Sequence, residues 1–497
     1  MPDITPEVQN ESNFSEQEQI RRDKLMSLID QGQSPYLLTH YEITHFAKQI
    51  SENYETLSDK DVSIAGRVMS RRLMGKASFA HMRDTTGDIQ LYIKRDDVGE
   101  ESYQSFKDSD LGDILGIKGY VFKTRTGEVS IHVREILLLS KCLKPLPEKW
   151  HGLQDADLRY RQRYLDMIVN PQVKDTFVKR SKIITAIRTF MDERGYLEVD
   201  TPILHVLETG SAARPFQTHH NTLDISMFLR VETELYLKRL IVGGFDKVYE
   251  IGRIFRNEGM STKHNPEFTT IELYEAYADY NVMMDLAEEL LSYVAKTVCG
   301  SEIITFQGQK INFGAPYARI SMADAVKRYS GIDFFLWETD KEARDCLDEL
   351  HIHYEKGATR GDCLPILFDE YVEKNLVQPT FVTDYPVENS PLAKRKADEP
   401  RLTERFELFI NGVEYGNAFS ELNDPIDQKE RFVRQVKERE ALGGKNAKVD
   451  EDFVNALEYG MPPTGGMGIG IDRLIMLLTD SPSIRDVLLF PTMKPVD

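Results

Sequence analysis

The 497-residue chain is poor in cysteine, in long apolar runs and in positive charge. Its four cysteines, Cys142, Cys299, Cys346 and Cys363, lie far apart and lack the paired spacing of a zinc site or a disulfide framework. No apolar run is long enough to span a bilayer, and the polar, acidic N-terminus lacks the parts of a secretory signal. We therefore expect a cytoplasmic protein without a membrane partner.

Basic residues are outnumbered over most of the chain. The 62 Lys and Arg residues stand against 81 Asp and Glu, and the resulting net charge of −19 argues against binding polyanions through overall charge. Residues 61–149 do not share this excess of acidic residues, because they contain 15 basic and 13 acidic residues. A nucleic-acid surface is therefore expected there. The length predicts two or three domains, and 41% hydrophobic with 29% charged residues is ordinary for a soluble enzyme.

The periodicity of apolar residues divides the chain. Residues 1–60 are expected to form a disordered tip and N-terminal helices, because residues 16–31 carry apolar side chains at helical spacing. Short alternating strands follow in residues 61–145 and favour a small five-stranded barrel of the oligonucleotide-binding (OB) type. Residues 146–175 are predicted to be a stiff connector, and residues 176–497 a second domain with a helical insertion at about 287–396.

A long antiparallel hairpin is predicted in residues 247–280. A strand over 248–255, a polar loop over 257–266 and a returning strand over 267–278 fit the pattern. Side chains alternate faces along a strand, so the returning strand presents an aromatic ring, a carboxylate and a phenol on one face. Such a face suits a nucleotide, although an ordinary solvated hairpin is the alternative. The residues concerned are Phe268, Glu272 and Tyr274 on the strand, Arg256 before the loop, and Glu258 and His264 within it.

Residues 405–422 predict a second hairpin. Asn411-Gly412 between two alternating runs indicates a type I′ turn, which pairs Glu407 with Gly416. Glu407 and Glu414 then share one face as diagonal neighbours, about 7–8 Å apart at Cα. Mg²⁺ carrying nucleotide phosphates would satisfy both carboxylates, whereas two solvated glutamates are the alternative.

Three further polar or aromatic positions on this hairpin need a local irregularity. By strict alternation Asn417, Phe419 and Glu421 lie opposite Glu414, so a common site requires a bulge, for which Gly416 is the cheapest place. Farther along, GGMGIGIDRLIMLL (465–478) reads as a glycine-rich turn before a helix that starts near Arg473. The glycines would let the backbone approach a ligand closely.

Three ordered motifs give the chain a resemblance to a known family. FRNEG, followed by HNPEFT and ELY, resembles the second motif of class II aminoacyl-tRNA synthetases in the form carried by lysyl-tRNA synthetases. RSKIITAIRTFMDER with YLEVDTPIL is similar to the first motif, and residues 465–478 to the third. The resemblance implies an α+β protein with an antiparallel-sheet catalytic domain surrounded by helices. It also implies a preceding OB-type barrel that reads the anticodon, and a homodimer.

The resemblance further implies an ATP-dependent ligase with Mg²⁺ as cofactor. L-Lysine would be activated to lysyl-adenylate and then transferred to the 3′-terminal adenosine of tRNA(Lys). Arg256 and Arg473 would be catalytic, and Glu407 and Glu414 would hold the metal. ATP binding would involve Arg256, Glu258, His264, Phe268, Glu407, Glu414 and Arg473; lysine binding Gly210, Glu234, Arg256, Glu272, Tyr274, Asn417, Phe419 and Glu421; and anticodon binding Arg67, Phe79, Gln90 and Glu128.

Other functions stay open on the sequence. A non-catalytic nucleic-acid-binding paralogue would be expected to have lost one of Arg256, Glu407, Glu414 or Arg473, and all four are present. A synthetase for aspartate or asparagine would need a cation where Glu421 stands. A lysyl ligase acting on a protein acceptor resembles the same catalytic domain, but in that family the N-terminal barrel is missing.

Overall fold

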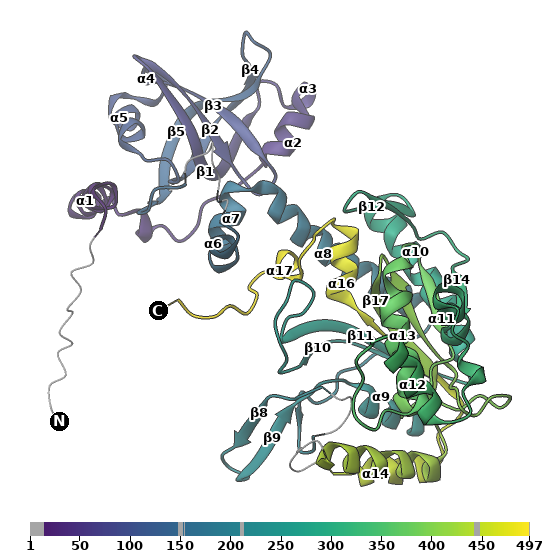
Figure 1. Cartoon of the computed structure of the whole chain (residues 1–497). Coiled ribbons are helices and arrows are strands. Elements are labelled where there is room, and N and C mark those ends of the chain that lie inside the picture. Colours follow the sequence, from purple (N-terminus) through teal and green to yellow (C-terminus); the bar gives the residue numbers. More distant parts are fainter. Residues whose placement is uncertain (1–13, 148–152, 154, 209–212, 442–447, 497) are drawn as a thin grey trace, which may run out of the picture. The chain divides into compact units, whose positions relative to one another are not determined.

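A computed structural model describes residues 14–147, 153, 155–208, 213–441 and 448–496 (Figure 1). The chain divides into two compact units, Met1–Gln154 and Asp155–Asp497. The predicted disordered tip, part of the predicted connector and Gly210 lie outside the described residues. No helix among the described residues is long and apolar enough to cross a membrane.

The first unit contains the predicted barrel. Five strands close in the order β1-β2-β3-β5-β4, as expected for an OB-type fold. In β2, Ser78, Ala80 and Met82 point inward and are buried, while Phe79 and His81 alternate with them on the outer face. The strands are β1 (Asp61–Met74), β2 (Ala77–Arg83), β3 (Asp88–Lys94), β4 (Ile114–Lys123) and β5 (Val129–Ser140), with α2 (Ala47–Glu52), α3 (Tyr54–Leu57), α4 (Arg95–Val98) and α5 (Glu100–Asp108) around them.

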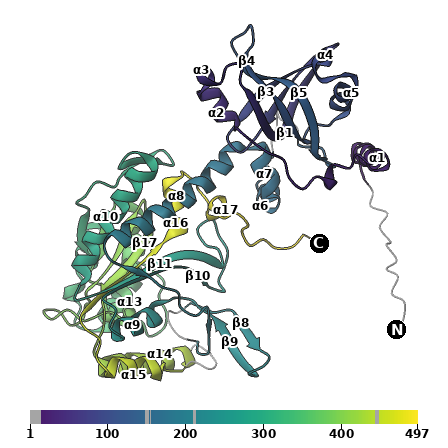
Figure 2. The same cartoon turned by 180° about the vertical axis from the view of Figure 1, so that it is seen from behind.

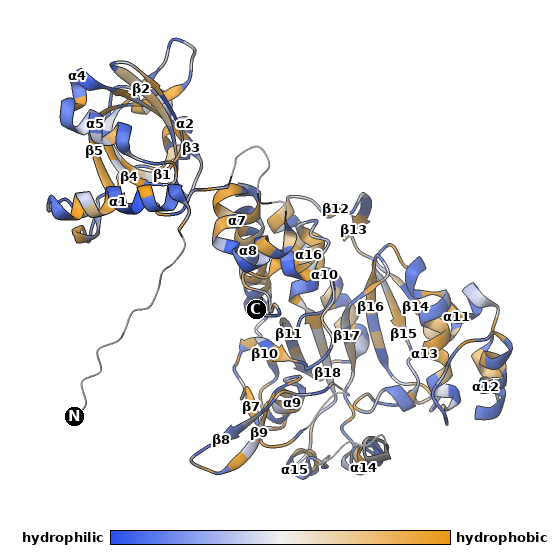
Figure 3. Cartoon of the chain, turned by 60° about the vertical axis from the view of Figure 1, so that its left-hand side comes forward, coloured by the Kyte–Doolittle hydropathy of each residue, from blue (hydrophilic) through white to orange (hydrophobic). Residues whose placement is uncertain are grey.

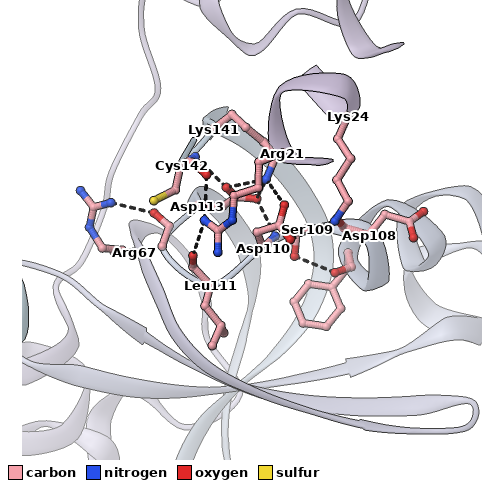
Figure 4. A network of polar contacts seen from close by, with 12 residues as sticks. Arg21, Lys24, Arg67, Asp108, Ser109, Asp110, Leu111, Asp113, Lys141 and Cys142 are labelled. Carbon is pink, nitrogen blue, oxygen red and sulfur yellow. Dashed lines mark hydrogen bonds and ion pairs between the residues drawn. The ribbon is translucent and has the colours of Figure 1, made fainter. Parts of the chain in front are cut away.

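The N-terminal helix α1 (Glu16–Asp30) docks on the barrel through a polar network (Figure 4). Arg21 donates to the carbonyl oxygens of Leu111 and Cys142 at 3.1 and 2.8 Å. Beside it, the buried Lys141 ammonium lies 2.9 Å from Asp113. From the helix, Lys24 also pairs with Asp110 at 2.9 Å, so Arg21 and Lys24 together fix α1 to one place on the barrel.

An eight-stranded mixed sheet organises the second unit, in the order β14-β15-β16-β17-β18-β11-β10-β6. The pairings from β15 to β10 are antiparallel, while β14 and β6 add to the two edges in parallel. The predicted α+β class, with a barrel followed by a helix-covered sheet, is confirmed. The strands are β6 (Leu197–Glu198), β10 (Lys247–Phe255), β11 (Glu267–Ala276), β14 (Ala318–Ser321), β15 (Thr380–Thr383), β16 (Arg405–Ile410), β17 (Val413–Ser420) and β18 (Thr464–Gly470).

Helices cover both faces of this sheet (Figures 1 and 2). Ile187, Leu290 and Leu474 from three helices join the largest core with Ile271 and Leu273 of β11. On the opposite face Val248 and Tyr274 pack with a smaller helical set, so the alternation of β11 separates the two faces. The first set comprises α8 (Pro171–Glu193), α10 (Tyr280–Cys299) and α16 (Ile471–Leu478), and the second α9 (Glu234–Val242) and α15 (Glu451–Glu458), with α14 (Pro425–Ala441) beside α15.

The predicted helical insertion differs from the structure. β14 and β15 belong to the main sheet, and α10 packs in its core, so only the helices between the two strands form an added layer. Their own core contains Val326, Leu347 and Leu364. In Figure 3, α11 and α13 carry orange, hydrophobic stretches beside blue, hydrophilic ones. Four-residue strands are too short for alternation to stand out among helices. The layer consists of α11 (Met322–Ser330), α12 (Asp340–Glu349) and α13 (Arg360–Tyr371).

Short elements complete the chain. They are α6 (Ala156–Arg161), α7 (Arg163–Val169) and α17 (Ile484–Val487); a three-stranded sheet of β7 (Leu204–His205), β8 (Gln217–His220) and β9 (Ile225–Leu229); a hairpin of β12 (Ile303–Phe306) and β13 (Gln309–Asn312); and the 3-10 turns η1 (Pro35–Leu37), η2 (Phe334–Leu336), η3 (Glu373–Asn375) and η4 (Val387–Asn389).

Candidate active site

The register of the β16–β17 hairpin decides which side chains share a face. Asn411 and Gly412 have φ values of 50° and 64°, so both central residues are left-handed, as a type I′ turn requires. The predicted pairing of Glu407 with Gly416 is wrong, because Glu407 pairs with Asn417. Tyr415 is the extra residue of a bulge between the pairs Leu408–Gly416 and Phe409–Glu414.

This bulge brings the polar positions of β17 to one side. Cross-strand partners share a face, and Glu407 and Phe409 lie on the same face of β16. Their partners Asn417 and Glu414 are therefore on that face as well, although their sequence numbers differ in parity. The predicted irregularity is confirmed, one residue before Gly416. It arises at a large aromatic residue, which is 5% exposed and joins the core.

Residues 464–470 form the central strand β18 and not the predicted glycine-rich turn. One row of partners across three strands is Tyr274–Gly466–Phe419, and the next is Glu272–Gly468–Asn417. The middle residue of each row has no side chain. A trough therefore runs along β18 between the side chains of β11 and β17. The glycines still let a ligand approach the backbone closely, as predicted, but they do so from a strand.

A cavity of about 760 Å³ occupies this trough. It is lined by side chains from β11, β17 and β18, the 256–266 loop, α9 and α16. Of the predicted ATP-binding and lysine-binding residues, those on its lining are Glu234, Arg256, Glu258, His264, Phe268, Glu272, Tyr274, Glu414, Asn417, Phe419, Glu421 and Arg473.

One part of the cavity carries arginines beside an aromatic ring. The Arg256 guanidinium lies 5.5 Å from the centre of the Phe268 ring. Arg473 donates to the backbone carbonyl of Glu414 at 2.6 Å, and its guanidinium lies 3.4 Å from His264 Nε2. Partial burial and the Arg473 cation lower the pKa of His264, so the imidazole is neutral near pH 7. Such a set can hold an aromatic base and anionic oxygens.

The other part of the cavity is crowded with carboxylates. Glu421 is fully buried, and its Oε1 has no hydrogen-bond partner among the described residues. A Cβ added at Gly466 would collide with this oxygen and with the Tyr274 ring, so only glycine fits there. Burial and the neighbouring Glu234 raise the pKa of Glu272 to about 7. A buried, under-compensated acidic pocket of this kind favours a cationic ligand.

Glu407 lies beside the main cavity, in a smaller one of about 220 Å³ that shares Arg405 and Asn389 with it. Burial and the nearby Glu414 raise the pKa of Glu407 to about 7, against the effect of Arg405, whose guanidinium lies 2.6 Å away. The two carboxylates are thus close enough to repel. Within the described part of the chain no three acidic, His or Cys side chains form a complete metal cluster, so this pair would hold an ion together with substrate oxygens.

The outer face of the barrel carries the residues predicted to contact the anticodon. Gln90 Nε2 donates to Glu128 Oε2 at 2.7 Å, and Phe79 lies on the same face, 5.1 Å from the Tyr92 ring. Arg67 instead donates to the Gly112 carbonyl at 2.7 Å (Figure 4). Because this side chain already bonds the barrel backbone, Arg67 has a structural role that competes with its predicted contact to the anticodon.

Two residues in these sites were not predicted. Arg72 is the exposed cross-strand partner of Phe79, a pairing that the β1–β2 register alone reveals. Lys238 lies fully buried between Glu234 and Glu421. Its spacing of four residues from Glu234 on one helix was a signal for that pair, but the contact with Glu421 spans 183 positions of the chain and has no local signature.

The fold and the cavity together define a class II aminoacyl-tRNA synthetase. A family model described as tRNA synthetases class II (D, K and N) matches residues 155–494, and one described as OB-fold nucleic acid binding domain matches residues 62–139.

Similar proteins narrow the family further. A lysine–tRNA ligase of Clostridium tetani is 57% identical over 491 residues, covering 98% of each chain. Those of Thermoanaerobacter pseudethanolicus and Clostridium novyi are each 58% identical, over 98% of this chain and 97% and 96% of their own. The chain belongs to the lysine–tRNA ligase family, and the resemblance seen in its motifs is confirmed.

Proposed function

We propose that this protein activates L-lysine with ATP and transfers it to tRNA(Lys). The observation that carries the proposal is the buried Glu421, whose Oε1 faces the cavity without a hydrogen-bond partner among the described residues. A substrate ammonium would supply the missing partner. Aspartate or asparagine would meet a carboxylate at this point, and like charges or unpaired groups would reject them.

The reaction has two steps and needs no nucleophilic side chain. A lysine carboxylate oxygen attacks the α-phosphorus of ATP, and the bond to the bridging oxygen breaks, which gives lysyl-adenylate and pyrophosphate. A ribose hydroxyl of the terminal adenosine of tRNA then attacks the lysyl carbonyl, its proton is lost and AMP leaves. Catalysis is positioning and charge stabilisation on a rigid sheet.

Arginine side chains would steady the anionic groups of the first step. Arg256 lies where the trough meets the Phe268 ring, so it would hold the α-phosphate and the lysine carboxylate while adenine stacks on that ring. His264 and Arg473 would bind the outer phosphates, and Glu258 would contact adenine. Arg256 and Arg473 are therefore the proposed catalytic residues.

The amino acid would lie along the acidic part of the trough. Glu234 would receive its α-amino group, with Gly210 as a further partner outside the described residues, and Glu272 would lie close to its side-chain ammonium. Asn417 Oδ1 accepts a hydrogen bond from Arg405 at 3.0 Å, which leaves the amide N–H groups for the lysine carboxylate. Tyr274, Phe419 and Glu421 would enclose the side chain and its ammonium.

Glu407 and Glu414 suit Mg²⁺ by their chemistry. They are two oxygen donors on one sheet face, with more negative charge than Arg405 alone offsets. Bound there with ATP, Mg²⁺ would supply positive charge for the phosphate oxygens. The chain's own contribution is to hold the two carboxylates close together while the Glu414 backbone is fixed by Arg473.

The barrel would bind the anticodon loop. Phe79 offers a ring for stacking, and Gln90 with Glu128 offers an amide and a carboxylate for the base edge. Arg72, opposite Phe79, is better placed than Arg67 to meet a phosphate, because Arg67 already bonds Gly112. Since tRNA is the acceptor, we place the protein in the cytoplasm.

A homodimer through the α8 region is also proposed. The segment that follows α8 exposes apolar side chains, and Leu197, Ile203 and Leu204 are each more than two-fifths exposed. Exposed apolar groups of this kind are typical of an association surface. Light scattering after gel filtration should give twice the 57.1 kDa chain mass.

Pyrophosphate exchange with each amino acid in turn tests the function. Only lysine should drive rapid exchange of label into ATP, and aminoacylation should require tRNA(Lys). Exchange with another amino acid would overturn the assignment of Glu421. Lysine-dependent exchange with transfer to a protein acceptor, and none to tRNA, would favour the lysyl-protein ligase.

A further inference from the structure

Lys238, on α9, is not on the cavity lining but contacts Glu421, which is. Its side chain has no solvent exposure, and its Nζ lies 2.5 Å from Glu234 and in contact with Glu421 Oε2. Aromatic rings surround the rest of the ammonium, with that of Phe419 5.4 Å away. A buried cation of this kind is costly unless each of its neighbours compensates it.

The two oxygens of Glu421 differ in their surroundings. Oε2 meets Lys238, whereas Oε1 faces the trough beside Gly466 and the Tyr274 ring and has no hydrogen-bond partner in the described structure. One oxygen is therefore occupied by the protein, and the other is free for a ligand. A single carboxylate can serve two ammonium groups in this way.

The other charged neighbours of Glu421 are acidic. Glu234 on α9 and Glu272 on β11 act on it, and Tyr274 adds a phenol, whose pKa is raised by burial and by these carboxylates together with Glu232. Burial and these carboxylates raise the pKa of Glu421, and Lys238 opposes the shift. The neighbouring carboxylates raise the pKa of Lys238 despite its burial, so it stays a cation.

We infer that Lys238 is a positioning residue for amino-acid selection, which holds Glu421 Oε2 and keeps this carboxylate ionised so that Oε1 can bind the substrate's side-chain ammonium. The inference rests on the proposed function. Without Lys238 the carboxylate would face only acidic neighbours and would take up a proton near neutral pH. A protonated Glu421 would bind a charged side chain scarcely better than an uncharged one.

The test compares the wild type with Lys238→Met and Lys238→Arg. L-Lysine and L-norleucine share the α-amino and carboxylate groups, so the ratio of their affinities cancels groups such as Asn417 that act at the other end. We would measure the KM for lysine and the Ki of norleucine in pyrophosphate exchange from pH 6 to 9, where the lysine side chain remains protonated. Lys141→Met, which removes a buried paired lysine from the barrel unit, is the matched control.

We define the lysine preference as the Ki of norleucine divided by the KM for lysine. In the wild type and in Lys141→Met, this ratio should be independent of pH. In Lys238→Met it should fall by about tenfold or more at pH 6 and recover by up to tenfold per pH unit as Glu421 ionises. Lys238→Arg, which retains the charge, should restore most of the preference. The KM for ATP should not change.

A preference in Lys238→Met that is lowered equally at every pH, together with a lower melting temperature, would show a purely structural role and overturn the inference. If that variant does not fold, the pH profile of the wild type still tests the inference. A tenfold fall in the wild-type lysine preference between pH 8 and 6 would show that Glu421 is not kept ionised and would overturn it. Wild-type protein that fails to activate lysine at all would overturn the proposed function instead.

Discussion

Arg180 of α8 lies 2.5 Å from Asp472 of α16, and the other oxygen of that carboxylate accepts a hydrogen bond from the Thr269 N–H of β11 at 2.8 Å. One buried carboxylate thus joins the three sequence motifs. Thr269 follows Phe268 and Asp472 precedes Arg473, so the pair also sets the spacing of two proposed ATP-binding residues.

Replacing Arg180 should loosen all three motifs together. Arg180→Met leaves the Asp472 carboxylate buried without its cation, and breaking such a pair costs about 3–5 kcal/mol. Thermal unfolding followed by circular dichroism should show a lower transition for the catalytic unit. Lys341→Met, which breaks an exposed ion pair with Asp345 on α12, should leave the transition unchanged, and equal effects of both variants would contradict the role given to Asp472.

Glu407→Gln should separate stability from activity. Because the pKa of Glu407 is raised to about 7, its ionised form costs stability in the folded state, and that cost grows as pH rises from about 4.5 through 7. The variant should therefore melt higher than the wild type at pH 8 without Mg²⁺, yet lose roughly a hundredfold in exchange rate, since several kcal/mol of charge stabilisation depend on the metal.

The control for this variant is Glu267→Gln. Glu267 on β11 is, like Glu407, a strand glutamate paired with an arginine, but its partner is Arg253 and it is not on the cavity lining. Its exchange rate should be that of the wild type. Glu407→Gln with activity within twofold of the wild type would show that the two carboxylates hold no metal.

Glu421→Gln should weaken lysine binding. Truncating one member of a buried charge pair costs about 2–5 kcal/mol, so the Kd for lysine should rise by roughly thirtyfold or more, measured by calorimetry. ATP affinity should stay the same. Lys238 would keep only Glu234 as its ionic partner, so we also expect a lower melting temperature; unchanged lysine affinity would move the specificity role to Glu272.

Gly466→Ala tests the shape of the pocket. Its methyl group would collide with Glu421 Oε1 and the Tyr274 ring, and overpacking of this kind costs about 1–3 kcal/mol. Lysine-dependent exchange should be lost while ATP still protects the protein against unfolding. At Gly468 an added Cβ would lie 3.5 Å from Glu272, an ordinary contact, so Gly468→Ala should keep its melting temperature.

Phe79→Ala should affect only the tRNA step. Stacking on an aromatic ring is worth about 1–3 kcal/mol per base, so the KM for tRNA(Lys) should rise by about tenfold while lysine-dependent exchange is unchanged. Arg72→Ala should act in the same direction, and more strongly than Arg67→Ala at equal melting temperature. A fall in both reactions in Phe79→Ala, with a lowered melting temperature, would make Phe79 a structural residue.

Local patterns predicted the elements that have strong local signals. The barrel strands alternate cleanly, and Asn411-Gly412 specifies its turn because both residues accept positive φ. The strand β18 was missed because glycines hide the alternation of Met467 and Ile469, the residues that show it. The cross-strand partners beyond the bulge could not be predicted either, since nothing in the sequence marks Tyr415 as the unpaired residue.

The residues that line the site were predictable through its motifs, but the contacts between them and residues from distant segments were not. Arg256, Phe268, Glu272 and Tyr274 follow from one hairpin and the resemblance it carries. Lys238 meets Glu421 only after α9 and β17 pack together, and Arg72 meets Phe79 only through the β1–β2 register. Contacts between distant segments of the chain depend on packing, which a one-dimensional pattern does not contain.

The bulge at Tyr415 makes the pairing register a functional property of β17. Asn417, Phe419 and Glu421 share a face with Glu414 only because Tyr415 is left out of the pairing. If Tyr415 were paired in regular alternation, these three side chains would enter the core and Ala418 would take their place in the trough. A substitution between Glu414 and Glu421 changes one contact, whereas pairing without the bulge would exchange the whole pocket wall with the core, so the register of this segment is under a stricter constraint than the identity of most residues within it.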